Sequence, residues 1–169
     1  MRLAQIVAVL FALLAMPALA QPAAPFGTGK KSDGRFTGIA LITDNARWYE
    51  LFRRPEPPRI RGKSDFARGE RGTLALIFSD AEPRNGRANI VCDVTAFDTA
   101  GSRVVVKSSP CYEGPYHGPN VLHPALLDIQ FTIGPDDPVG RAGFRVTMRD
   151  AHSGRKVELA VFFSQGTAK

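Results

Sequence analysis

The fold is decided by three consecutive segments near the C-terminus: Leu127-Asp-Ile-Gln-Phe-Thr-Ile133, Phe144-Arg-Val-Thr-Met-Arg149 and Val157-Glu-Leu-Ala-Val-Phe-Phe163. Apolar and polar residues alternate strictly in the first two segments. Because successive side chains of a strand point to opposite faces, each segment offers one apolar face and one polar face. The pattern therefore predicts a three-stranded meander whose apolar face must be covered by a second layer.

Four further segments read as strands: Phe36–Ile42, Thr73–Phe78, Ala88–Phe97 and Arg103–Lys107. Thr73–Phe78 is apolar throughout its interior, which predicts a central strand covered on both faces. The aromatic-rich segment near Asn45–Phe52 fits a short helix and a strand equally well. Short strands separated by turn signals indicate an all-β fold, and we expect an antiparallel β-sandwich of about seven or eight strands.

Residues 1–20 have the pattern of a secretory signal peptide, with a positive start at Arg2, an apolar run, and small residues before a cleavage point at Ala20. The apolar run is shorter than the roughly 20 residues that a membrane-spanning helix needs, and no later stretch is apolar enough. We expect export to the periplasm or beyond the cell, a flexible leader over residues 21–34, and a single domain over residues 35–169.

The chain holds 2 cysteines, Cys92 and Cys111. A lone pair in an exported protein usually forms a disulfide, because the compartment is oxidising. The loop-entropy relation gives such a bridge about 3 kcal/mol of stability. A redox role would require a Cys-x-x-Cys pair, which is absent.

The segments Phe66–Phe78 and Phe131–Asp150 resemble immunoglobulin-like secreted domains of the macroglobulin type, as they occur in exported bacterial proteins. The second segment carries the apolar strand, the Asp-x-Pro-x-Gly turn and the returning strand of those modules, and the first resembles their Gly-Glu entry to a central strand. The resemblance implies an immunoglobulin-like sandwich. The chain departs from antibody domains because no Trp lies between its two Cys residues, and it lacks the Cys-Gly-Glu-Gln thioester of the large macroglobulins.

Catalytic signatures are missing from the sequence, since neither a Gly-x-Ser-x-Gly elbow nor a His-Glu-x-x-His pair occurs. We expect no enzyme activity and no cofactor. His117, His123 and Glu113 share one Pro-rich segment, and two imidazoles with a carboxylate would suit zinc or copper. The alternative is that both histidines are plain solvent-exposed loop residues.

The most informative polar feature is the Pro-rich stretch from Arg47 to Arg71, where eight basic residues stand against four acidic ones. The formal net charge of the chain is +6, and this stretch holds most of the excess. Arginine pairs with carboxylate and phosphate in a bidentate manner, so we expect an anionic partner. The candidate patch consists of Arg53, Arg54, Arg59, Arg61 and Lys63. A solvated, solubilising surface is the alternative.

Together these features favour a non-enzymatic periplasmic binding or accessory module. Its specificity would lie in two irregular segments, Arg53–Arg71 and Ser108–Pro124, because long Pro-rich loops are often functional. The expected partner is an envelope protein, or an anionic glycan or lipid surface, rather than nucleic acid. Two alternatives stay open: a loop-borne metal site, and a structural envelope role through an exposed sheet edge.

Overall fold

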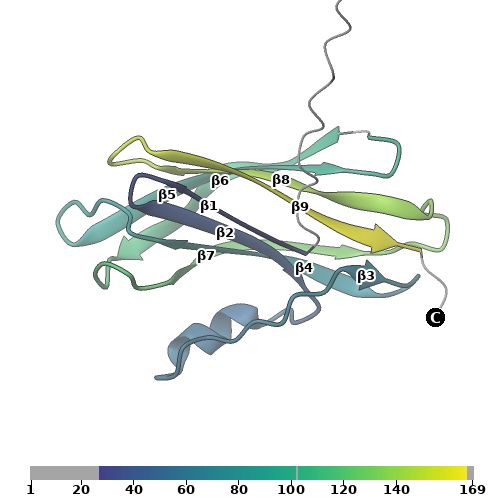
Figure 1. Ribbon diagram of the computed structural model, residues 1–169, viewed down its shortest axis with the longest axis horizontal. Coiled ribbons are helices and arrows are strands. Elements are labelled where there is room, and N and C mark those ends of the chain that lie inside the picture. The colour runs from purple at the N-terminus through teal and green to yellow at the C-terminus, as the bar shows by residue number, and fades with distance from the viewer. Residues whose placement is uncertain (1–26, 102, 167–169) are drawn as a thin grey trace, which may run out of the picture.

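The computed structural model describes residues 27–101 and 103–166, which form two β-sheets packed face to face (Figure 1). The first sheet has the order β1-β2-β4-β7. Its strands are β1 (Thr28–Asp33), β2 (Phe36–Thr43), β4 (Arg71–Ser79) and β7 (His123–Thr132). All of its strand pairs are antiparallel.

The second sheet has the order β3-β9-β8-β5-β6. Its strands are β3 (Asp65–Phe66), β9 (Lys156–Gln165), β8 (Gly140–Asp150), β5 (Arg87–Phe97) and β6 (Arg103–Pro115). The pairs are antiparallel except for the two-residue β3, which runs parallel to β9. The predicted all-β sandwich is confirmed, and each of the seven segments that read as strands lies in a strand, except that Ile133 follows the end of β7.

The C-terminal segments do not form a single meander, so that part of the prediction is wrong. β7 belongs to the first sheet, whereas β8 and β9 belong to the second. The apolar face of β7 instead packs across the interface, where the Phe131 ring lies 4.6 Å from Phe163 and 5.7 Å from Phe144 between centroids. The alternation of apolar and polar residues shows which side chains of a strand face inward. It does not show to which sheet the strand belongs, because the strands of both sheets alternate in the same way.

β4 is buried on both faces, as its sequence predicts. Leu74, Leu76 and Phe78 point into the core between the sheets and are fully buried. Ala75 and Ile77 point to the opposite face, where they cluster with Leu41 and Trp48. β4 therefore separates an inner core from a smaller outer one.

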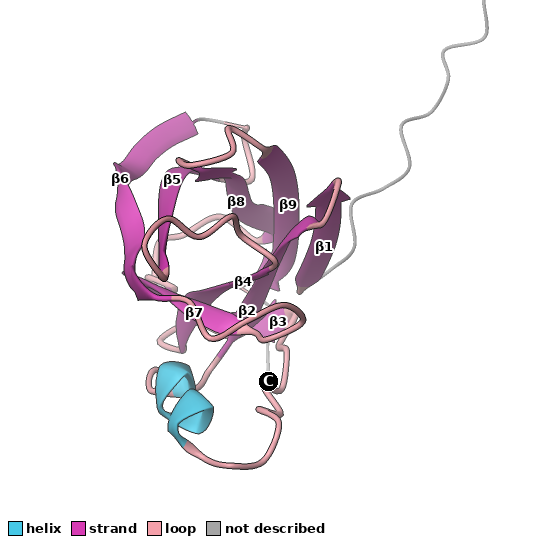
Figure 2. Cartoon of the chain, turned by 90° about the vertical axis from the view of Figure 1, so that its left-hand side faces the viewer, coloured by secondary structure: helices cyan, strands magenta, loops and turns pink. Residues whose placement is uncertain are grey.

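The aromatic-rich segment resolves as a six-residue 3-10 helix, η1 (Trp48–Arg53), on the outer side of the first sheet (Figure 2). The Asn45 side chain starts the turn by accepting a hydrogen bond from the Arg47 amide at 3.0 Å. Arg54 is extended, as expected for a residue that precedes a proline, and Pro55 therefore ends the helix.

A strand occupies part of the predicted leader, which corrects the expectation of flexibility for residues 28–33. β1 pairs with β2 along its whole length although only Gly29 is buried. A Cβ atom at Gly29 would lie 3.1 Å from the Ala160 carbonyl oxygen, so the close approach favours glycine. The predicted signal peptide and residues 21–26 lie outside the described residues.

The second segment predicted as irregular, Ser108–Pro124, is largely strand. β6 continues through Pro115 and β7 begins at His123, which leaves residues 116–122 as the connecting loop. Prolines within a strand suggested a loop, but β6 is an edge strand with a register shift opposite Ile90 and Val91, and both settings accommodate proline.

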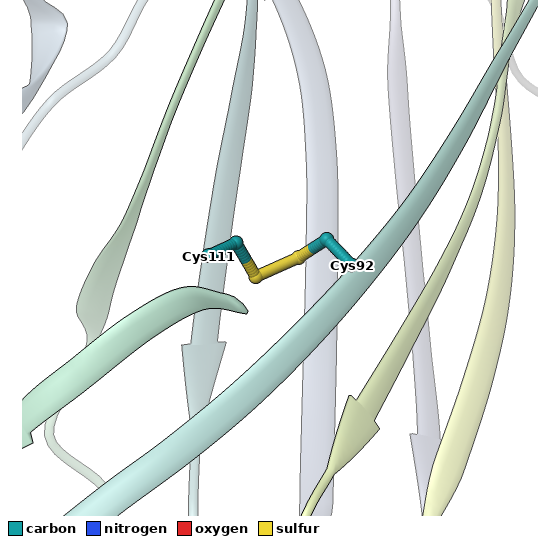
Figure 3. Close-up of a disulfide and its surroundings, with 2 residues drawn as sticks. All are labelled: Cys92 and Cys111. Carbon is teal, nitrogen blue, oxygen red and sulfur yellow. A yellow bond between two sulfur atoms is a disulfide. The ribbon is translucent and has the colours of Figure 1, made fainter. Parts of the chain in front are cut away.

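The predicted disulfide is present, and it joins Cys92 of β5 to Cys111 of β6 with a Cα–Cα distance of 5.6 Å (Figure 3). The register shift pairs Ile90 with Tyr112 and Val91 with Pro110, so Cys111 is the extra residue of a bulge. Both cysteines are buried in the inner core.

Within the described residues, no helix has the length and apolar character that crossing a bilayer demands.

Candidate functional site

A hollow lies where η1, the 116–122 loop and β7 meet, and we call it the outer groove. It has a volume of about 700 Å³. Aromatic and aliphatic side chains dominate its lining. The lining residues are Ala46, Trp48, Tyr49, Phe52, Arg53, Tyr112, His117, Val121, Leu122, His123, Pro124, Leu126 and Leu127.

The aromatic side of the outer groove comes from η1. Trp48 is only 3% exposed because it packs on Ala75 and Ile77 of β4. The rings of Tyr49 and Phe52 stand edge-on to Trp48, with centroids 6.3 Å and 6.0 Å away. Helical spacing therefore buries one ring as an anchor and leaves the other two at the groove surface, each partly buried.

The opposite wall comes from a bulge in β7. Leu74 pairs with Ile129 and Leu76 pairs with Ala125, so three residues of β7 oppose Ala75 alone. The inward-facing set of β7 nevertheless continues through Ala125, Leu127 and Ile129, so Leu126 points to the opposite face, as a neighbour in a strand does. Leu126 is 64% exposed and lines the groove.

The groove also gathers exposed aliphatic side chains from the loop. Val121 and Leu122 are each more than a third exposed, and with Leu126 they make three of the five exposed large hydrophobic residues in the described part of the chain. Single exposed aliphatic residues are ordinary, but a cluster of them in a concave site marks an interaction surface.

His123 forms the polar part of the groove's inner side. Its ring is almost completely buried and stacks near Phe78, Tyr116 and His117, with centroids 5.0, 5.6 and 5.4 Å away. Its Nε2 atom has no hydrogen-bond partner. Burial, and secondarily the positive charge of His117, lower the pKa of His123 below its ordinary value. At neutral pH the ring is therefore uncharged.

Of the predicted ligand set His117, His123 and Glu113, the structure brings together the two histidines but not the glutamate. The two imidazoles stack, and His117 is exposed as expected, but His123 is buried, contrary to the alternative of two exposed loop residues. Tyr112 of β6 faces the core, where its ring contacts Phe78, so the next residue, Glu113, points to the other face. The described residues contain no cluster of three His, Cys, Asp or Glu side chains suited to a metal ion.

The five cations of the predicted patch line three different hollows. Arg53 lines the outer groove, Arg54 and Arg59 line a second hollow with Glu56, and Arg61 and Lys63 line a third with Asp44 and Asp65. The four arginines are exposed.

Lys63 has a structural position instead. Its Nζ atom lies 2.9 Å from a carboxylate oxygen of Glu70 and 4.9 Å from the centroid of the Phe66 ring. The carboxylate and the aromatic ring hold this cation against the fold. The predicted patch therefore reduces to its four arginines.

Sequence reasoning missed the aliphatic wall of the groove. The available signal was Leu126, an apolar residue at a position where the two-residue alternation of β7 places the side chain on the outer face. Val121 and Leu122 were a second signal, since two apolar residues inside a Gly- and Pro-rich loop have no obvious core to enter.

Comparison with known proteins identifies no relative of this chain. No known protein family matches the sequence, and no curated protein is similar to it. Among solved structures, the fold is similar to part of a family 123 glycoside hydrolase from Clostridium perfringens, studied for glycolipid glycan hydrolysis. That similarity has a TM-score of 0.44 and 8% identity, and it covers 76% of this chain but 27% of the hydrolase.

Proposed function

We propose that the protein is a non-enzymatic, exported binding module that recognises an anionic partner at the outer groove and through the exposed arginines that follow Arg53 in the chain. One observation carries the proposal. The two segments in which the sequence places specificity, Arg53–Arg71 and Ser108–Pro124, meet in this groove through Arg53 and the residues from Tyr112 to Pro124. A disulfide is compatible with a secreted or periplasmic location.

The character of the groove supports binding rather than chemistry. A volume of about 700 Å³ and a mainly apolar lining with a few polar groups are typical of ligand sites. No carboxylate lines it, and its one permanently charged residue is Arg53. Since Arg54, Arg59 and Arg61 follow on the same segment and are exposed, a negative partner gains several favourable contacts at low salt.

The direct test is retention on an anionic matrix at low ionic strength. Replacing Arg53, Arg54, Arg59 and Arg61 by Gln should move elution to clearly lower salt, because exposed charge contacts are screened within about 10 Å at 0.1 M salt. The matched control replaces four exposed basic residues outside both segments, Lys30, Lys31, Arg145 and Arg149, which changes the net charge equally. Equal shifts in the two variants would mean that net charge, not this site, governs retention.

A pull-down from envelope extract separates this proposal from a structural role. β7 is an edge strand of its sheet, and a partner that pairs with its backbone should stay bound in high salt. A partner held by the arginines should be released. If a partner stays bound in high salt, and also binds the variant in which the four arginines are replaced, the result would favour pairing with the strand edge.

A further inference from the structure

We infer that the outer groove holds a monomeric long-chain carboxylate, with its hydrocarbon body on the aromatic and aliphatic walls and its carboxylate on Arg53. This inference rests on the proposed function and specifies the ligand class of the same site. It uses three features of the groove: its two apolar walls, its single permanent charge, and an inner side at His123 that adds no permanent charge.

The two walls suit an unbranched apolar body. Tyr49 and Phe52 stand on one side, and Leu122 and Leu126 on the other. Leu126 is the most exposed of these aliphatic side chains at 64%, so a bound chain would remove from water a surface that the fold itself leaves uncovered. Burial of apolar area is the main source of affinity for such a ligand.

The charge of the groove selects a monoanion. Arg53 is the one permanently charged residue in the lining, and no acidic side chain opposes it. A carboxylate brings one negative charge and accepts both hydrogen bonds of a guanidinium fork. A phosphate monoester carries about −1.5 to −2 charges at pH 7, which would leave negative charge without a partner in an apolar site.

His123 lines the inner side of the groove without adding a permanent charge. Its ring is almost completely buried, and this burial lowers its pKa below the ordinary value. The ring is therefore uncharged at neutral pH, and Arg53 remains the permanent positive charge available to the carboxylate.

Trp48 provides the readout, since it is the only tryptophan of the chain and it lines the groove. We would titrate the mature protein with n-alkanoates of eight, ten and twelve carbons below micelle formation, following tryptophan emission and binding heat. Affinity should rise with length, by up to about fourfold per methylene. Alkyltrimethylammonium ions of equal length should bind at least about tenfold more weakly, since they lack the charge-assisted hydrogen bond.

Two variant pairs locate the site. Arg53→Gln should weaken alkanoate binding about tenfold or more, while Arg149→Gln, an exposed arginine on β8, should not change it. Leu126→Ser should weaken binding, while Val139→Ser, which removes a side chain of similar exposure outside the groove lining, should not. All four side chains are exposed, so each variant is expected to fold, which thermal unfolding would verify.

Several results would overturn the inference: equal affinity for carboxylates and ammonium ions, no effect of Arg53→Gln, or neither heat nor a change in Trp48 emission. Binding to anionic phospholipid vesicles without binding to monomeric alkanoates would also overturn it. If alkanoates fail while retention on the anionic matrix still depends on the four arginines, the ligand class is wrong and the binding function stands. If retention on the anionic matrix also does not depend on the four arginines, both the ligand class and the binding function are wrong.

Discussion

The two faces of β4 are covered in different ways. On the inner face, Leu74, Leu76 and Phe78 are sealed by a complete second sheet. On the outer face, Ala75 and Ile77 are covered mainly by Trp48 from a six-residue helix. A sheet covers a whole face, whereas a short helix covers part of one and leaves a groove beside it. The inner face therefore supplies most of the buried core, and the proposed binding site lies on the side of the outer face.

The largest effect should come from truncating the inner face. Leu76→Ala removes a fully buried side chain from the core between the sheets and should lower the free energy of unfolding by about 4 kcal/mol, since a cavity adds to the lost burial. Urea unfolding followed by circular dichroism measures this. A loss below about 1 kcal/mol would show that the second sheet does not seal this face.

Loss of the disulfide should cost slightly less. Replacing Cys92 and Cys111 by Ala releases a bridge of sequence separation 19, which the loop-entropy relation values at about 3 kcal/mol. Because the bridge lies in the inner core, alkanoate binding by the folded variant should be unchanged. Unaltered stability to urea would mean that the bridge is not formed in the mature protein.

A smaller, pH-dependent effect should arise at His123, where the inner core meets the outer groove. Its pKa in the folded protein is lowered from 6.5, so below about pH 6.5 the unfolded chain binds more protons and stability falls as the pH drops. The groups facing the ring are His117, Tyr112 and Tyr116, and Asp80 acts on Tyr116.

The variant His123→Phe isolates that effect, because phenylalanine keeps the ring stacked on Phe78 but cannot titrate. Chemical unfolding at pH 7.5 and 5.5 should show a smaller loss of stability in the variant than in the natural chain. If both lose the same stability over this range, protonation of His123 is not responsible.

The smallest effect on stability should come from the outer face. Leu126→Ser changes a side chain that is 64% exposed, so the free energy of unfolding should stay within about 0.5 kcal/mol. Binding at the groove should nevertheless weaken. A large destabilisation would instead show that Leu126 supports the fold, and the contrast between the two faces would be lost.

The sequence predicts the strands better than their arrangement. The alternation in Leu127–Ile133 identifies β7 and its buried residues, because side-chain direction depends only on local geometry. The sheet to which β7 belongs depends on long-range pairing with β4, which no local pattern encodes. β1 was missed because backbone hydrogen bonds to β2 hold it, and its side chains are almost all exposed.

The candidate site was predicted in part. Proline and arginine content pointed to the segments that meet at the groove, yet the tertiary fold decides that Arg53 and the loop of His117 line the same groove. The predicted patch included Lys63 because its contacts with Glu70 and Phe66 are recognisable only in the folded structure. The exposed Leu126 could have been recognised in the sequence, because it is an apolar residue on the outward-facing side of the alternation.

A methyl NMR titration tests most directly whether the ligand binds on the outer side of β4 and leaves the core on its inner side unchanged. With Leu and Val methyl groups labelled and dodecanoate added, we predict shifts confined to Val121, Leu122, Leu126 and their neighbours in the groove. The methyl groups of Leu74 and Leu76 should stay in place. Shifts centred on those inner residues, or on Val104 or Val139 away from the groove, would contradict the account.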